Sequence, residues 1–163
     1  MKQRSLLLFL AVLLASVGCD HATKQIARSA LDGAGAVSLA GETVRLELTS
    51  NRGAFLSLGA GLPAEVRDVA FLVIVPVILA ALCWAFLRSG ALRSREAIGL
   101  ALVVGGGGAN WLDRLLHEGA VTDFVSLGLG TVRTGIFNLA DLEIMLGAAL
   151  VVAATWRSDR PRV

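Results

Sequence analysis

The chain has little charge and few of the side chains that bind metals or form disulfides. Only 17% of its 163 residues are charged, and it holds two cysteines and two histidines. With a mean hydropathy of +0.71, this composition excludes an ordinary soluble domain and predicts a membrane protein with several spans. The net charge of +2 is small and the basic residues stand at the ends of apolar runs, so we expect no nucleic-acid partner.

The cysteines and histidines do not form a ligand set. Cys19 and Cys83 lie inside apolar runs, and their spacing fits neither a disulfide framework nor a zinc site. His21 and His117 also lack metal-ligand spacing. We therefore expect two small buried cysteines, no metal and no other cofactor.

Four apolar segments predict membrane-spanning helices over about residues 5–28, 68–88, 96–115 and 137–157. The second holds Pro76, a potential kink. The third is glycine-rich at residues 105–108, where the missing side chains permit the close approach of a neighbouring helix or of an apolar substrate helix. We expect residues 1–163 to form a single integral-membrane domain.

The N-terminal apolar run has two interpretations. A basic start, an apolar middle and the sequence SVGC ending at Cys19 are typical of a lipoprotein signal peptide. However, Ser16 stands where such a signal usually has leucine, and three further apolar segments follow. We therefore expect an uncleaved first helix. Near its end, Asp20 and Lys24 stand four residues apart and share a face.

Residues 36–62 change character and predict a small β-structured lobe. In VRLELTS, from Val44 to Ser50, apolar residues alternate with polar ones, which is typical of a half-buried strand. Asn51 and Gly53 then indicate a turn. The expected fold class is a membrane α-helical protein: a four-transmembrane-helix bundle with a small extracytoplasmic β-structured lobe between helices 1 and 2.

Positive charge predicts the orientation of the spans. Basic residues cluster at the N-terminus, in the loop from Arg88 to Arg95 and after Trp156, and four spans place all three clusters on one side. By the positive-inside rule both termini are then cytoplasmic. The outer side receives the β lobe and a set of polar residues from the helix ends: Asp20, Lys24, Asn110, Arg114, Asn138 and Asp141.

Two acids stand beside apolar segments, where a carboxylate is costly and is therefore a candidate functional group. Asp123 lies in VTDF and Asp141 in FNLAD, and the predicted topology puts both at the outer rim of the bilayer. Two close carboxylates share a proton at neutral pH and can activate a water for peptide hydrolysis without a covalent intermediate. Alternatively, either residue caps a helix.

Other interpretations stay open on the residues alone. Asp113 next to Arg114 is most simply a structural ion pair at a helix end. No serine stands in an obvious context with a histidine or lysine base. The acids could also form an ion relay in a transporter or channel subunit, or play a structural role in a membrane scaffold. A relay predicts polar residues spread through the depth of the membrane, whereas here they gather at one side.

Five motifs carry a family resemblance: DHATK, NRGAF, GGGGANWLDR, VTDF and FNLAD. They resemble those of the lipoprotein signal peptidase family, also called signal peptidase II, across nearly the whole chain. The resemblance implies a four-helix aspartic endopeptidase of the bacterial inner membrane. Such an enzyme removes the signal peptide from diacylglyceryl-modified prolipoproteins, just before the lipidated cysteine, so its partners are this substrate and the lipid bilayer.

The same resemblance implies roles for single residues. It makes Asp123 and Asp141 the catalytic pair, and it places substrate-binding or site-organising roles on Asn110, Arg114, Asn51, Asn138, Asp20 and Lys24. We expect Asp20 with Lys24 to fix the first helix against the lobe. The chain departs from the family pattern twice: NRGAF is one small residue shorter before its aromatic, and Ala109 replaces the usual glycine before Asn110.

Overall fold

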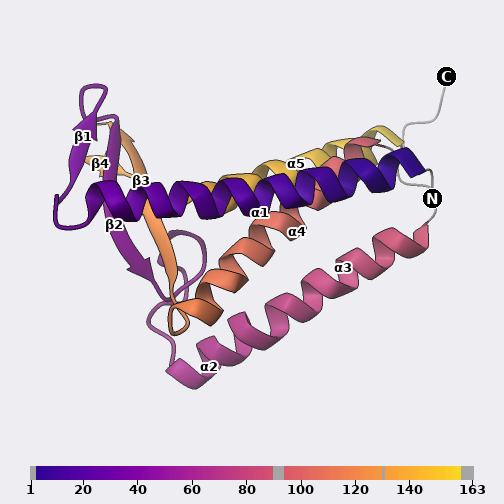
Figure 1. The fold of residues 1–163 in the computed structure, drawn as a ribbon, viewed down its shortest axis with the longest axis horizontal. Helices are drawn as coiled ribbons and strands as arrows, with labels where there is room; N and C mark the ends of the chain where they lie inside the picture. Colours follow the sequence, from indigo (N-terminus) through magenta and orange to yellow (C-terminus); the bar gives the residue numbers. More distant parts are fainter. Residues whose placement is uncertain (1–2, 90–93, 130, 159–163) are drawn as a thin grey trace.

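The structure, a computed structural model, describes residues 3–89, 94–129 and 131–158. Long helical segments form a bundle, and a small sheet lies across one end of it (Figure 1). Three of the helices are α1, α4 and α5, which span Gln3–Leu31, Ser94–Leu116 and Leu139–Ser158. A further segment consists of α2, the π-helical η2 and α3, which span Ala64–Asp68, Val69–Ile74 and Val75–Ser89.

Three described segments are long and apolar enough to cross a membrane: Gln3–Leu31, Ala64–Arg88 and Leu139–Trp156. The third expected span, α4, falls short in composition because it combines a glycine run with polar residues in its last turns. This helix lies between α1 and α5 and also contacts α3. Because its neighbours cover it, α4 needs less apolar surface than a lipid-facing helix.

The irregular turn in the second segment has a cause in the sequence. Pro76 has no N–H to donate to the carbonyl of Leu72, and a proline ring crowds the preceding turn of a helix. The chain accommodates this with the π-helical η2 immediately upstream. The carbonyl of Leu72 instead accepts a hydrogen bond from Trp111 Nε1 of α4, at 3.3 Å. The proline therefore helps to attach this segment to α4.

The strands of the sheet come from two separate segments between helices, whereas the sequence predicted one. The lobe expected over residues 36–62 supplies β1 and β2, which span Val37–Leu39 and Val44–Asn51. The connection between α4 and α5 supplies β3 and β4, which span Val121–Leu129 and Val132–Arg133. The strands follow the order β1-β2-β3-β4 and are all antiparallel. The expectation missed the second pair because its pairing with β2 is non-local and its local pattern is weak.

The strand register gives the sheet two unlike faces. Thr49 pairs with Asp123 and Asn51 with Val121, so these four side chains share one face. A β-bulge between Leu46 and Thr49 adds one residue to β2, so that these two side chains lie on the same face of the sheet. The same face continues outward through an apolar set: Val37, Leu39, Val44, Leu46, Val125 and Leu127. The opposite face carries the polar pair Arg45 and Ser126.

The glycine run of α4 serves helix packing. A Cβ on Gly105 would lie 2.6 Å from Ser16 Oγ of α1, and one on Gly106 would lie 2.6 Å from the carbonyl oxygen of Ala140 in α5. Both glycines therefore permit backbones to approach closely within the bundle. The expectation of two buried cysteines was wrong for Cys19, which is exposed, while Cys83 is half-buried.

Candidate active site

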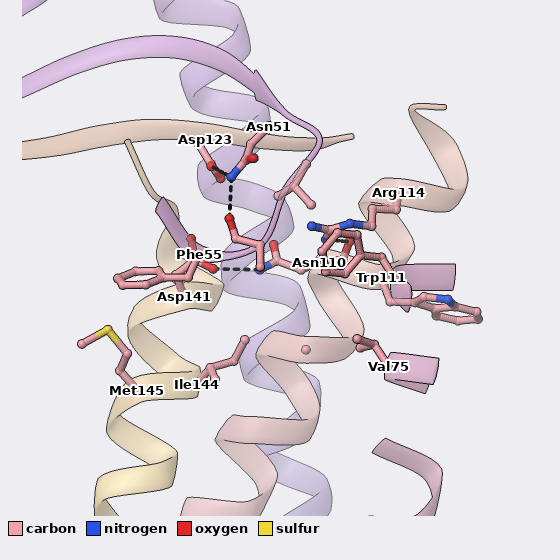
Figure 2. A pocket seen from close by; sticks show the side chains of 14 residues that line it. Asn51, Phe55, Val75, Asn110, Trp111, Arg114, Asp123, Asp141, Ile144 and Met145 are labelled. Carbon is pink, nitrogen blue, oxygen red and sulfur yellow. Dashed lines mark hydrogen bonds between the residues drawn. The ribbon is translucent and has the colours of Figure 1, made fainter. Parts of the chain in front are cut away.

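Two separate elements bring Asp123 and Asp141 to the same cavity. Asp123 lies on β3 and is 1% exposed, and Asp141 lies in the first turn of α5 and is 7% exposed. The cavity has a volume of about 320 Å³, and both acids line it (Figure 2). Its remaining wall is largely apolar, with side chains from η1 (Phe55–Ser57), η2, α3, α4 and α5 that include Phe55, Phe71, Val75, Ile144 and Met145.

Asn138 links the two acids. Its Oδ1 accepts the backbone N–H of Asp141 at 3.0 Å, and Asp141 Oδ2 accepts the backbone N–H of Asn138 at 3.2 Å. This reciprocal pair is a capping box at the start of α5. Asn138 Nδ2 also donates to Asp123 Oδ1 at 2.7 Å. One residue therefore caps the helix that carries one acid and holds the carboxylate of the other. Asp123 itself lies in a strand and caps no helix.

Two further asparagines satisfy the remaining carboxylate oxygens. Asn51 Nδ2 donates to Asp123 Oδ2 at 2.8 Å, and Asn110 Nδ2 donates to Asp141 Oδ1 at 3.1 Å. Each oxygen of both acids thus accepts a hydrogen bond from an asparagine. Such contacts fix the rotamers of the two carboxyl groups on the cavity wall.

The environment of Asp123 favours its protonated form. Burial raises the pKa of this carboxyl to about 6, against the opposing effect of the hydrogen bond from Asn51. The neighbouring negative charge of Asp141 contributes to this increase in pKa, and the hydrogen bond from Asn138 opposes it. Asp123 therefore keeps its proton to a much higher pH than an isolated aspartate does.

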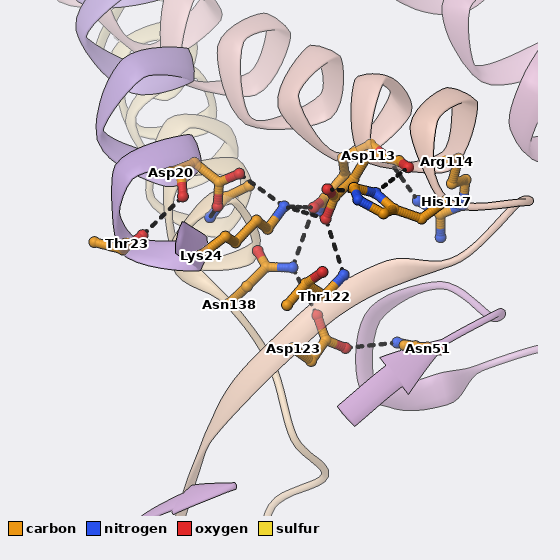
Figure 3. Close-up of polar contacts among 12 residues, drawn as sticks. Asp20, Thr23, Lys24, Asn51, Asp113, Arg114, His117, Thr122, Asp123 and Asn138 are labelled. Atoms are coloured by element: carbon orange, nitrogen blue, oxygen red, sulfur yellow. Dashed lines mark hydrogen bonds and ion pairs between the residues drawn. The ribbon is translucent and has the colours of Figure 1, made fainter. Parts of the chain in front are cut away.

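A buried ionic cluster surrounds Lys24 (Figure 3). Lys24 is 1% exposed, and its Nζ lies 2.7 Å from Asp20 Oδ2 and 3.2 Å from Asp113 Oδ2. Lys24 also donates to Asn110 Oδ1 at 2.9 Å. Asp20 Oδ1 accepts the backbone N–H of Ala140 at 3.0 Å. The expectation that this pair fixes the first helix against the lobe is wrong, because its partners lie on α4 and α5.

The expected pairing of Asp113 with Arg114 is also wrong. Asp113 pairs with Lys24 and with Arg28 Nη2, the latter at 3.3 Å, and its Oδ2 accepts the backbone N–H of Thr122 at 2.9 Å. Adjacent residues on a helix point in different directions, so Arg114 reaches elsewhere. Its guanidinium donates to the carbonyls of Gly53 and Asn110 and stacks on the Phe71 ring, 4.6 Å from the ring centroid.

Sequence reasoning missed Arg28 and Thr122 as members of this cluster. Arg28 Nη2 bonds to Asp113 Oδ1 and to the hydroxyl of Thr122. A signal for Arg28 was present, because Asp20, Lys24 and Arg28 recur every four residues and so share one helix face. Among the residues that the structure describes, no group of three or more His, Cys, Asp or Glu side chains is placed to hold a metal ion.

Two solved structures share the fold of this chain. A solved structure of a bacterial membrane enzyme has a TM-score of 0.77 to this chain, with 22% sequence identity over all of this chain and 95% of that one. A second solved structure of a bacterial membrane enzyme has a TM-score of 0.73, with 23% identity over 95% of this chain and 94% of the other. These likenesses show the fold.

The sequence comparisons identify the family. The model of the Signal peptidase (SPase) II family matches residues 12–157. The lipoprotein signal peptidase of Rhodococcus jostii (strain RHA1) is 38% identical over 94% of this chain and 74% of that protein. The Brucella ovis enzyme of the same name is 33% identical over 69% of each protein. The chain therefore belongs to the signal peptidase II family, and it is a membrane protease.

Proposed function

We propose that this chain is an aspartic endopeptidase that removes the signal peptide from diacylglyceryl-modified prolipoproteins and cleaves before the lipidated cysteine. The observation that carries the proposal is the pair of acids on one cavity wall, joined through Asn138. Membership of the signal peptidase II family supports the substrate class. The described residues supply the acid and base groups that hydrolysis needs.

The chemistry follows from one proton shared by two carboxyl groups. The ionised acid takes a proton from a water in the cavity, and the water oxygen attacks the scissile carbonyl carbon. The protonated acid gives its proton to the carbonyl oxygen, which forms a tetrahedral intermediate. When the C–N bond breaks, the carboxyl group that took the water proton gives it to the leaving amine, and the other carboxylate takes a proton from a hydroxyl of the intermediate, which becomes the new carboxyl end of the cleaved peptide. No covalent bond to the protein forms, and the dyad of Asp123 and Asp141 returns to its singly protonated state.

The surrounding polar groups suit a role in holding the scissile segment. Arg114 lines the cavity with two N–H groups bound to carbonyls of Gly53 and Asn110, and its buried Nε has no hydrogen-bond partner in the described part of the chain. An unpaired buried donor is costly unless a ligand uses it. Hydrogen bonds to a substrate carbonyl here gain strength because the apolar wall excludes water.

The shape of the bundle suits a substrate that arrives from the bilayer. The cavity wall is formed by Phe71 and Val75 on one side and by Ile144 and Met145 on the other. Figure 1 shows α2 and α3 diverging from α5 toward the sheet. We infer that a signal-peptide helix enters between these two sides, so that its cleavage point reaches the acids without leaving the membrane surface.

The sheet supports a position at the outer surface of the membrane. The face that carries Asp123 continues as apolar side chains, and among them Leu39 is 47% and Leu127 41% exposed. Water does not favour such a surface, whereas the boundary of a bilayer does. We infer that four spans, including α4, cross the bacterial inner membrane. Both termini are then cytoplasmic, and the sheet and the acids lie on the outer side.

Complementation tests this function. A bacterium depleted of its own lipoprotein signal peptidase accumulates unprocessed prolipoprotein, and expression of this chain should restore the mature form. The Asp141→Asn variant should fail at equal membrane abundance, because the amide cannot act as an acid or a base. If the unmodified chain fails to mature any prolipoprotein although it is inserted and folded, the assignment is wrong.

A further inference from the structure

A polar contact joins α1 to α5 outside the cavity. The hydroxyl of Ser16 donates to Glu143 Oε2. Ser16 is 3% exposed, Glu143 is half-buried, and neither lines the cavity that holds the acids. A carboxyl group at this position in a membrane helix is costly, so its presence calls for a function.

This contact runs parallel to a second one between the same helices. The other contact is the hydrogen bond from the Ala140 N–H to Asp20 Oδ1, at 3.0 Å. Ser16 and Asp20 are one helical turn apart on α1, and Ala140 and Glu143 are one turn apart on α5. The two contacts therefore connect one face of α1 to one face of α5, and we call them the α1–α5 ladder.

Helix α4 packs closely against both helices of the α1–α5 ladder. Ser16 lies against Gly105, where an added Cβ would be 2.6 Å from its hydroxyl oxygen. The carbonyl oxygen of Ala140 lies against Gly106, where an added Cβ would also be 2.6 Å away. Helices α1 and α5 thus both pack against glycines of α4, and the α1–α5 ladder connects them to each other.

On α5, the two residues of the α1–α5 ladder stand on either side of Asp141 in the sequence. Ala140 precedes this acid and Glu143 follows it, while Asp141 itself points to Asn110. We propose that Glu143 is a positioning residue: through Ser16 it fixes the first turn of α5 and so holds Asp141 in register with Asp123. This inference rests on the proposed function of the two acids.

Several charged groups surround Glu143. Asp20 and Lys24 face it from α1, and Asp141 lies on its own helix. Asp113 of α4 is paired with Lys24. The three N–H groups of Lys24 are engaged by Asp20, Asp113 and Asn110, so Lys24 donates no hydrogen bond to Glu143. The amide oxygen of glutamine can accept the same hydrogen bond from Ser16, so glutamine can replace Glu143 in this contact.

Steady-state kinetics in detergent with a lipidated prolipoprotein peptide test the proposal. Glu143→Gln should keep kcat within about twofold, because its amide oxygen still accepts the Ser16 hydroxyl. Glu143→Ala and Ser16→Ala should each lower kcat about tenfold or more with KM unchanged, since small displacements of a reacting group are costly. The double variant should be no worse than either single variant. Wild-type kcat in Glu143→Ala, or a Glu143→Gln variant as impaired as Glu143→Ala, would overturn the proposal.

A distance measurement separates this proposal from the proposed function. Spin labels at the exposed positions His21 and Leu142, in a chain without Cys19 and Cys83, report the distance between α1 and α5. The distribution should broaden in Glu143→Ala and Ser16→Ala but not in Glu143→Gln. An unchanged distribution in Glu143→Ala refutes the ladder even if the enzyme cleaves its substrate. A broadened distribution in a chain that cleaves nothing refutes the function alone.

Discussion

Asn138 Nδ2 donates a hydrogen bond to Asp123 Oδ1 at 2.7 Å, although the two residues lie on different elements and 15 positions apart in sequence. The same asparagine forms a capping box with Asp141. The start of α5 and the start of β3 are thus held to each other at the point where both acids meet the cavity. The proposed chemistry depends on this link.

Asn138→Ala should therefore impair catalysis more than binding. The change removes the helix cap, which costs about 1 kcal/mol, and it frees both carboxyl groups to turn away from each other. We expect kcat to fall about 100-fold with a small change in KM, measured on a lipidated peptide. Asn138→Ser keeps a capping hydroxyl and serves as the control for helix stability. Equal activity of both variants with the wild type would contradict a linking role.

The pH dependence should reflect the raised pKa of Asp123. Activity that needs one shared proton falls as pH rises through the pKa of about 6, because the second carboxyl then ionises. The hydrogen bond from Asn51 favours the ionised form, so Asn51→Ala should raise this pKa and move the alkaline limb of kcat/KM to higher pH. Arg52→Ala, at an exposed neighbour, should leave the limb in place. A limb that moves to lower pH in Asn51→Ala would count against the assignment.

Asp113→Asn should act on stability. The buried Lys24 then loses one of its two anionic partners, and Arg28 loses its own, at a cost on the order of 3 kcal/mol. We expect a lower Tm in detergent and reduced membrane abundance, with near-normal kcat for the molecules that remain folded. Glu118→Gln is the matched control, because that side chain is 92% exposed and should change neither quantity. Full abundance without activity would show that Asp113 takes part in the chemistry.

Two glycines of one run should respond in opposite ways to alanine. Gly106→Ala places a methyl group 2.6 Å from the Ala140 carbonyl oxygen and should destabilise the packing of α4 against α5 by about 1 to 3 kcal/mol. Gly108→Ala meets no atom within 4 Å and should be neutral or slightly stabilising, because alanine favours a helix. Thermal unfolding in detergent measures both. Equal Tm values for the two variants would show that the glycine contacts do not hold α4 to α5.

The lipid on the substrate should matter as much as its sequence. Acyl chains and an apolar signal helix confine the cleavage point to the membrane surface, where the proposed site lies. We expect turnover of a diacylglyceryl-modified peptide and little turnover of the same peptide with a free cysteine thiol. Equal rates for the two peptides in detergent would mean that the substrate class is wrong.

Much of the arrangement was predictable from the sequence. Apolar runs and their basic flanks predict helices that bring residues as distant as Asp20 and Ala140 to one end of the bundle, and the structure places them in contact. The second half of the sheet was not predictable, because the pairing of Thr49 with Asp123 is non-local. The partners of Asp113 were not predictable either. They follow from how α1 and α4 are rotated about their axes, which only packing determines.

The most direct test of the central claim is the cleavage rate of the purified protein with Asp123→Asn and with Asp141→Asn, on a lipidated prolipoprotein peptide. Each variant should fold and insert like the wild type and lose about 1,000-fold or more in kcat, because neither amide can move a proton. Cleavage at the wild-type rate by either folded variant would remove that residue from the mechanism and contradict the two-acid account.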